Sequence, residues 1–560
     1  HTNQFSANEF QQTMVDPNRQ IIVDTTNYNL NSLSHSSAPS FGGSLLYNHR
    51  FNSHGRNFSV LVTGGSSTSN QYQNPVYTYF KGQPNAPLFQ QINTDSHTDS
   101  AGVVFSYIEP LSKRSYVEAN YGYHTSTTTS DKATDTLASD GVTINNYALL
   151  SNDYKFTFVT NRFGVNYRFI EKKYNYTLGI AAQPSVLSGE SPNSAATNIN
   201  TFNFSPVARF IYNFSRSQSL SFNYSGASNT PSYYELQPVT DYSNAKYPVV
   251  GNPGLNPEYN NTVSLRYNNF SFTTGDIFFT NLNFTQTDNK IVSNTVSYPQ
   301  NYTLDPKLKG TILTRYQNAP GFYSASAFYL YAKPWDKRKF TLLFNGNLSY
   351  NNNISFITNA DSLDNETTQK NIAKNLVFTQ GVRFRVDITD VIDAEANASY
   401  GINHSVNSIP QPNINNNFRT ISYGLNGKNY LWKDWTLSYD YTKTIYQGYV
   451  GATNPNIFNT YIERRFLKGN VGTLRLSAFD LFNQNTGFTS TQNGTQISQT
   501  NANRLGRYYL LTFTLRLQKF AGKGPSRGPG EPGGFRPGGG GGGFRPGGGG
   551  GGFPGGGPGE

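Results

Sequence analysis

Strict alternation of polar and apolar residues recurs along most of this chain. In residues Ser219–Ser225 every second side chain is apolar, and the residues between them are small and polar. Successive side chains of a β-strand point to opposite faces, so such a run predicts a strand with one apolar and one polar face. These runs are joined alternately by short charged turns and by long polar connections. This arrangement is typical of a transmembrane antiparallel β-barrel, so we expect an all-β fold.

Composition favours a membrane barrel over a soluble all-β protein. Hydrophobic residues make up 36% of the 560 residues, while aromatic residues alone make up 15%. This balance is poor for filling a large buried core, but it suits a wall with an apolar outer face and a hydrated interior. A membrane-spanning helix needs about 18 consecutive apolar residues, and no stretch approaches that length. We therefore expect strands to cross the membrane.

Several classes of chemistry are not expected. The chain has no cysteine, which excludes disulfides, thiolate catalysis and zinc–thiolate sites. Its seven histidines lack the spacing of metal ligands, and no enzyme motif is present, so we predict no catalytic residue, cofactor or metal site. The formal charge of +11 does not indicate nucleic-acid binding, because many basic residues lie in the turns instead of on one face.

The predicted strands number about nineteen between Ala38 and Phe520. Outer-membrane barrels have an even number of strands and short periplasmic turns. An odd number therefore predicts further strands before His1, and three more would complete a 22-stranded barrel. The chain also opens without a signal peptide, so we expect either a mature fragment or a truncated open reading frame. We assign residues 1–37 to the end of an extracellular loop and residues 38–520 to the barrel.

The long connections are rich in Asn, Ser, Thr, Gly and Pro. They predict extracellular loops, and a ligand would bind there, although no pattern identifies the residues that bind it. The predicted loops are residues 67–97, 127–151, 189–200, 228–258, 288–319, 353–371, 405–416, 447–456 and 483–503.

Alternation also assigns the two faces of the wall. The residues predicted to face lipid are Phe222, Tyr224, Leu265, Tyr267, Phe344, Leu348, Phe513 and Leu515. Those predicted to face the lumen are Ser221, Arg266, Asn345, Asn347, Thr512 and Arg516. The three tryptophans, Trp335, Trp432 and Trp435, lie beside short turns, which predicts positions at the membrane–water interface.

Charged residues suggest two further features. Asp361, Asp364 and Glu366 share one predicted loop, and they are either a Ca²⁺ site with oxygen ligands or ordinary solvated side chains. Charges inside a barrel commonly pair across strands. The expected pairs are Arg385 with Asp387 and Arg475 with Asp480.

The composition changes after Phe520. Residues 521–560 are mostly Gly and Pro, which cannot bury enough surface to offset the loss of backbone entropy, so we predict a disordered periplasmic tail. Outer-membrane barrels usually end on an aromatic residue that the assembly machinery recognises. Phe520 is the candidate for that signal.

Two motifs together resemble a known family. The first is Gly251, Asn252, Pro253, Gly254, Leu255, Asn256, Pro257 and Glu258, which lies just before a predicted strand. The second runs from Leu476 to Asn485 and is followed by the closing run from Gly506 to Leu517. In this order they resemble the barrels of TonB-dependent receptors, in the form found among Bacteroidetes outer-membrane barrel proteins. The first motif is expected to form a turn that leads into a strand, because proline restricts the backbone angles and glycine permits unusual ones. The alternative is that its residues contact a ligand directly.

The resemblance implies energised uptake of a nutrient across the outer membrane, such as a metal chelate, an oligosaccharide or a peptide. It also implies a plug domain and a motif that contacts an inner-membrane energy-coupling complex, neither of which is visible in this sequence. The expected partners are outer-membrane lipid, that complex and a surface lipoprotein. Two alternatives remain: a passive porin, and a scaffold barrel that organises surface lipoproteins.

Overall fold

The computed structural model describes most of the chain. The described residues are 2–7, 10–15, 21–52, 55–81, 89–137, 144–148, 151–191, 194–229, 231–236, 240, 246–409, 417–432, 434–449, 452–467, 471–485, 487–493, 496–501 and 505–515. For some of these residues the structure describes the backbone alone. They are the described residues among 2–30, 152, 194–195, 197, 233–234 and 488–501. Within the described residues, no helix is long and apolar enough to cross a membrane.

Nineteen successive strands of the described chain form one antiparallel wall, in which each strand pairs with the next. They are β4 (Ser40–Arg50), β5 (Asn57–Lys81), β6 (Gln90–Pro110), β7 (Ser115–Leu137), β9 (Asn152–Ile170), β10 (Tyr174–Ser191), β11 (Ser194–Asn213), β12 (Gln218–Asn229), β14 (Glu258–Phe270), β15 (Ile277–Asp288), β18 (Phe322–Trp335), β19 (Phe340–Ala360), β20 (Glu366–Ile388), β21 (Ile392–Asn407), β22 (Asn417–Leu431), β23 (Trp435–Gln447), β24 (Asn456–Phe466), β25 (Gly472–Phe479) and β28 (Tyr508–Leu515). The all-β fold and the count of nineteen are confirmed for this part of the chain.

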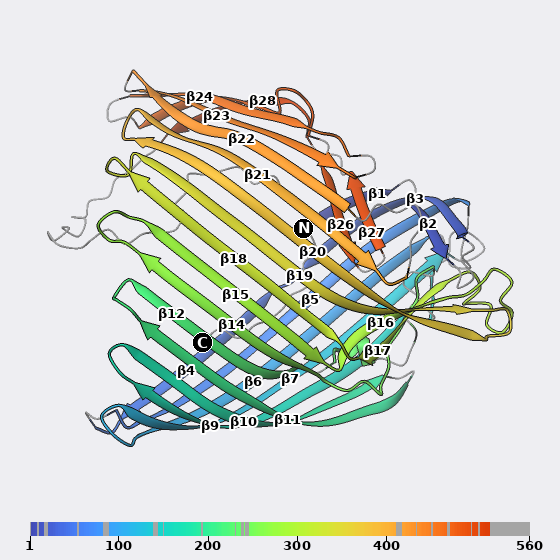
Figure 1. The fold of residues 1–560 in the computed structure, drawn as a ribbon. Helices are drawn as coiled ribbons and strands as arrows, with labels where there is room; N and C mark the ends of the chain where they lie inside the picture. The colour runs from blue at the N-terminus through green and yellow to red at the C-terminus, as the bar shows by residue number, and fades with distance from the viewer. Residues whose placement is uncertain are drawn as a thin grey trace.

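The wall curves round a central space. In Figure 1 the strands β12 to β22 lie in front and slope one way, while β5, β6 and β7 pass behind them and slope the other way. Opposite slopes on the near and far sides are what the tilted strands of a barrel produce. The short turns gather at one end, on the left of Figure 1, and the long connections at the other end, which we call the mouth.

The remaining elements are not among these nineteen strands. They are β1 (Thr2–Ala7), β2 (Phe10–Val15), β3 (Ile21–Ser37), β8 (Ile144–Asn146), the single helical turn α1 (Tyr233–Leu236), β13 (Val249–Val250), β16 (Lys290–Ser297), β17 (Ile312–Ala319), β26 (Phe488–Asn493) and β27 (Gln496–Asn501). The segment assigned from sequence to an external loop, residues 1–37, thus contains three strands. β3 pairs with β5 directly beyond the place where β4 does, so β3 and β4 form one interrupted strand along β5. The boundaries of the three proposed domains remain predictions.

The wall strands are longer than the sequence predicts. The pairing of β5 with β6 continues from the short turn to Gln73 and Ile92, and β5 extends to Lys81 along β3, so strands occupy most of the predicted loop 67–97. The hairpin of β19 and β20 likewise occupies nearly all of the predicted loop 353–371. The prediction of loop structure is wrong for these residues, because strand pairing continues through them. In these segments Ser, Thr and Asn replace the alternation that reveals a strand. Their extracellular position stays a prediction.

The register confirms the alternation of the two faces in the central strands. Phe222 lies opposite Leu265, which in turn lies opposite Leu282. On the other face, Ser221 lies opposite Arg266. Phe222 is 37% exposed and Leu282 is 44% exposed. Large apolar side chains are therefore exposed along the outer face of the wall.

At the two ends of the described wall, β4 and β28 each have one partner, whereas β3, which continues the line of β4, also pairs with β1 and β2. Within the described residues, β4 pairs with β5 and β28 pairs with β25. Completion of a 22-stranded barrel by further strands stays a prediction.

The face assignment predicts different effects for two neighbouring substitutions in β14. Leu265→Arg places a charge on the lipid side and should lower the free energy of unfolding by about 2–4 kcal/mol if it lies near the membrane midplane. Ser264→Arg places the same side chain in the hydrated lumen and should have a much smaller effect. Folding into lipid vesicles, followed by denaturant titration, measures both values. Equal losses would contradict the assignment.

Candidate functional site at the mouth

A small sheet extends from the wall at the mouth. β16 and β17 form an antiparallel hairpin, and β16 also runs parallel to the outer end of β19, from Phe356 to Asn359. β13 adds a short parallel strand to the far side of β17. We call β13, β17 and β16 the mouth sheet. Figure 1 shows β16 and β17 at the mouth end, next to β19 and β20.

The mouth sheet reaches a second part of the wall through an apolar cluster. Its four buried members are Leu187 of β10, Leu236 of α1, Leu255 in the connection before β14, and Ile291 of β16. The half-buried residues packed against them are Phe156, Phe158, Ile199 and Tyr316. Leu187 is 5% exposed, whereas its neighbour Val186 is 36% exposed on the opposite face. The cluster therefore lies on the lumen face of β9, β10 and β11. The mouth sheet is hydrogen-bonded to β19 on one side and packed against β9–β11 on the other.

The glycine–proline motif found in the sequence lies in this cluster. Leu255 is 2% exposed and is one of its four central residues. The Asn252 amide donates Nδ2 to the Tyr316 carbonyl at 3.1 Å, and its Oδ1 accepts from the Gly254 backbone at 2.9 Å. Gly251 and Pro257 are half-buried, whereas Pro253 is exposed in the turn. The motif thus ties the connection after β12 to β17.

Glu258 ends the motif and begins β14. Its Oε1 accepts from Lys290 Nζ at 2.7 Å and from the Ile291 backbone nitrogen at 2.8 Å. The buried carboxylate therefore holds the first residues of β16 against the wall. This contact joins the start of the mouth sheet to the strand that follows the motif.

The three loop acids each have a separate partner. The Asp361 carboxylate accepts from the backbone of Leu363 at 2.8 Å, and Glu366 pairs with Arg315 at 2.8 Å. Asp364 accepts from the Tyr302 hydroxyl at 3.0 Å. Burial, together with this hydrogen bond, raises the pKa of Tyr302 to about 12, so the hydroxyl stays a donor. In the described part of the chain, no group of three His, Cys, Asp or Glu residues is placed to hold a metal ion.

The lumen pairs differ from the prediction in one case. Arg385 pairs with Asp387 at 3.3 Å, as expected, and also with Asp393 at 3.1 Å. Arg475 instead binds Glu463, its cross-strand neighbour, with Nε 2.8 Å from Oε2. Asp480 is buried in the turn after β25 and accepts from the backbone of Gln484 and Asn485 at 3.0 Å. The pairing of Arg475 with Asp480 is therefore wrong, because Asp480 stabilises the turn of its own motif.

The tryptophans lie at the short-turn end of the wall. Trp335 ends β18 and stacks on Phe340 and Phe384, with ring centroids 5.8 and 5.9 Å away. Trp435 begins β23, with the Arg464 guanidinium 5.3 Å from its ring, and Trp432 in the turn is 80% exposed. Their place at the membrane interface stays a prediction. Arg516, Phe520 and the tail 521–560 lie outside the described residues.

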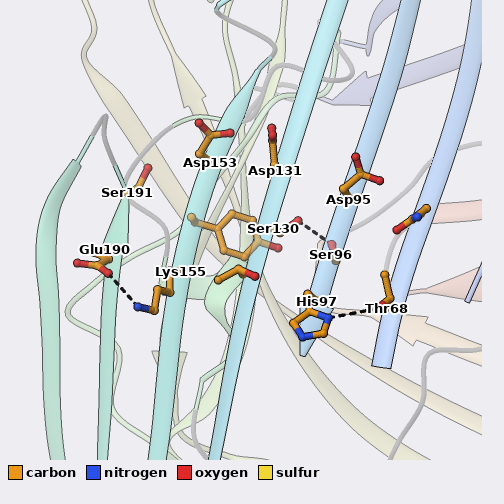
Figure 2. Close-up of a pocket in the computed structure, with 13 residues that line it drawn as sticks. Thr68, Asp95, Ser96, His97, Ser130, Asp131, Asp153, Lys155, Glu190 and Ser191 are labelled. Carbon is orange, nitrogen blue, oxygen red and sulfur yellow. Dashed lines mark hydrogen bonds and ion pairs between the residues drawn. The ribbon is translucent and has the colours of Figure 1, made fainter. Parts of the chain in front are cut away.

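A polar groove of about 710 Å³ lies on the outward face near the mouth, across β5, β6, β7, β9 and β10 (Figure 2). Its residues Asp95 and His97 share a face of β6 with Val103 and Phe105, which places them above the apolar band. Thr68 Oγ1 lies 3.1 Å from His97 Nδ1, and Lys155 lies 3.7 Å from Glu190. The groove therefore lies outside the lumen.

Three carboxylates of this groove are cross-strand neighbours. Asp95 faces Asp131, which faces Asp153. The hydrogen bond between Asp131 and Asp153, followed by burial and the like charge, raises the pKa of Asp131. Like charges directly opposite in a sheet destabilise the pairing.

Sequence reasoning missed how the mouth is built. It found Leu255 as part of a motif, but it treated residues 288–319 as a loop and did not connect them to β9–β11. Residues such as Val292, Val296 and Leu313, which are buried in β16 and β17, were the available signal. Their alternation predicts strands, but nothing local predicts a parallel partner in β19.

The curved antiparallel wall, its exposed apolar face and its polar interior define a transmembrane β-barrel. Residues 49–515 match the outer membrane protein beta-barrel family. This chain belongs to that family, and its location is the cell outer membrane.

The chain is similar to solved structures of outer-membrane receptors and transporters. The copper transporter OprC has a TM-score of 0.40 and 10% identity, over 86% of this chain and 80% of its own. The ferric citrate transporter FecA has a TM-score of 0.40 and 11% identity, over 92% and 77%. The Serratia marcescens hemophore receptor HasR has a TM-score of 0.38 and 10% identity, over 91% and 80%. No curated protein matches this chain.

Truncation of the motif leucine should release the mouth sheet. Leu255→Ala removes buried methyl groups and leaves a cavity, which should cost about 2–5 kcal/mol of local stability. Amide hydrogen exchange should then increase at β13 and at the start of β16, with little change in the membrane part of the wall. Leu304→Ala is the matched control, because Leu304 is 63% exposed in the connection between β16 and β17. An equal effect of both variants would contradict the anchoring role.

The carboxylate row predicts a dependence on pH. The pKa of Asp131 is higher in the folded state than in the unfolded state. The protonated Asp131 side chain therefore contributes to stability below its unfolded-state pKa, and this contribution is lost as the pH rises through its folded-state pKa. The protection factors of the amides near residues 129–133, which are corrected for the intrinsic pH dependence of exchange, should therefore be higher at acidic than at neutral pH. Asp131→Asn should raise them at neutral pH and weaken the dependence. Lower protection factors in this variant at neutral pH would refute the account.

Proposed function

We propose that this barrel belongs to an energised nutrient importer of the TonB-dependent type. The observation that carries the proposal is the size of the wall. Porins with an open aqueous channel have about 16–18 strands, whereas transporters with about 22 strands have a plugged lumen. The nineteen wall strands in the described residues exceed the porin range. A lumen of this width needs a plug to act as a barrier, and we propose that a plug segment belongs to the complete protein.

The mouth sheet supports a selective entrance. It is anchored to β19 by strand pairing and to β9–β11 by buried apolar side chains, so part of the entrance is covered by folded structure. We propose that the ligand enters beside this sheet and contacts the loops around it. The substrate class remains a metal chelate, an oligosaccharide or a peptide.

Two partners follow from this function. The exposed apolar wall is proposed to contact outer-membrane lipid, with Trp335, Trp432 and Trp435 at the interface. Energy would come from an inner-membrane complex that contacts a segment preceding the barrel. A surface lipoprotein partner is the basis of the scaffold alternative.

Uptake in the native cells tests the proposal. Cells with and without the gene are given ferric citrate labelled with radioactive iron, labelled maltohexaose or a labelled hexapeptide, each at submicromolar concentration. An importer should give accumulation of at least one probe that requires the gene and stops when a protonophore collapses the inner-membrane gradient.

The other functions predict different results. Gene-dependent entry that continues in the presence of protonophore would support a porin and contradict the proposal. Unchanged uptake of all three probes, with loss of proteins from the cell surface, would support a scaffold and contradict it as well.

A further inference from the structure

One arc of the lumen wall is unusually basic. The lumen face of β9, β10, β11, β12 and β14 carries Arg162, Arg168, Arg209 and Arg266, which we call the arginine arc. In the described part of these strands, the acid on that face is Glu258, which is bound to Lys290 at the mouth. The arc therefore has an excess of positive charge inside the barrel.

Another part of the lumen has balanced charge. In β20, β21, β24 and β25, Arg383 pairs with Glu395 at 3.9 Å, Arg385 pairs with Asp393 at 3.1 Å, and Arg475 binds Glu463 at 2.8 Å. These contacts are the cross-strand pairs expected of a wall that neutralises its own charge. Within the described residues, arginines in this part of the lumen therefore have acidic partners, unlike Arg209 and Arg266 of the arginine arc.

The members of the arc have few partners. Arg168 reaches Glu118 at 3.5 Å, and Arg162 donates to the neutral Asn120 amide at 3.1 Å. The Arg266 guanidinium lies 5.8 Å from the centre of the Phe279 ring. Arg209 is exposed, and within the described residues it has no hydrogen bond or ion pair. Arg209 and Arg266 are therefore free of carboxylate partners in this part of the chain.

The register places the arginines in a diagonal series. Arg168 and Arg209 both face Thr177 of β10, so they lie two strands apart, or about 10 Å. Arg209 faces Asn223 of β12, and Arg266 faces Ser221, two residues along the same strand. The step from Arg209 to Arg266 is therefore about 12 Å across and along the sheet. The side chains between them are hydroxyl and amide groups.

This arrangement suits oxyanions. The guanidinium is always charged and offers paired N–H donors that match carboxylate and phosphate oxygens. A wall with one sign of charge also concentrates solutes of the opposite sign. Successive weak sites allow a solute to enter and to leave again, as passage through a pore requires.

We propose that the arginine arc binds small solutes that carry carboxylate or phosphate groups, and that the substrate of this barrel is anionic. The inference rests on the proposed uptake function for its biological meaning, but the binding itself does not require energised transport. It makes Arg209 and Arg266 the central contacts, with Arg168 as the next member of the series.

Binding to the refolded full chain in neutral detergent micelles tests the proposal. Calorimetric titrations use tricarballylate as the carboxylate probe, pyrophosphate as the phosphate probe, and spermidine as a cation of similar size. The wild-type chain should bind at least one of the two anions, with an affinity that falls as salt increases, and should not bind spermidine. The variant Arg209→Gln/Arg266→Gln should bind that anion at least tenfold more weakly.

The control variant has the same change in charge elsewhere in the lumen. Arg383→Gln/Lys428→Gln alters the lumen face of β20 and β22 and should change the affinity less than twofold. The heat-modifiable migration of each variant shows that it has folded. Equal weakening by both variants, no anion binding by the wild-type chain, or equal binding of spermidine would overturn the proposal.

The relative response to tricarballylate and pyrophosphate identifies the preferred oxyanion. The outcome is separate from that of the uptake experiment, because binding in micelles is measured without an energy source. Anion binding without energised uptake would retain the arc and reject the importer. Energised uptake without anion binding would do the reverse.

Discussion

Every backbone N–H and C=O group within the hydrocarbon layer needs a partner from the protein, because water is absent there. In this chain the partners come from neighbouring strands, and one continuous antiparallel wall is the result. The pleat then sends alternate side chains to the outer face of the wall and to the lumen. Phe222, Leu265 and Leu282 form an apolar row, while Ser221 and Arg266 face the lumen. The polar interior and the mouth are both built on this wall.

The mouth sheet shows how a wide barrel can acquire a structured entrance. Backbone pairing with β19 supplies one attachment, and burial of Leu187, Leu255 and Ile291 supplies the other. Glu258 adds an ion pair and a backbone contact at the start of β16. Because the lumen face of β9–β11 is apolar at this level and polar below it, the same strands anchor the sheet near the mouth and carry the arginine arc deeper in the barrel.

The sequence predicted the wall well where one face meets lipid and the other meets water. It was wrong about the loop structure of residues 67–97 and 353–371, because hydrogen bonding extends strands such as β5 and β19 through segments that lack the alternation of polar and apolar residues. It was also wrong about Arg475, whose partner Glu463 is a neighbour in the sheet and not in the chain. In each case the missing information was register between strands.

The sequence by itself determined the class of fold, the approximate number of strands, the alternation of faces and the positions of the short turns. These properties depend on local periodicity and on residues that favour turns, which a single strand or hairpin carries within itself. Only the tertiary structure decided that Leu255 packs against Leu187, that β16 runs parallel to β19, and that four arginines share one arc of the lumen. The physical reason is that curvature and register bring together residues from separate strands, and no local pattern encodes which of them will meet.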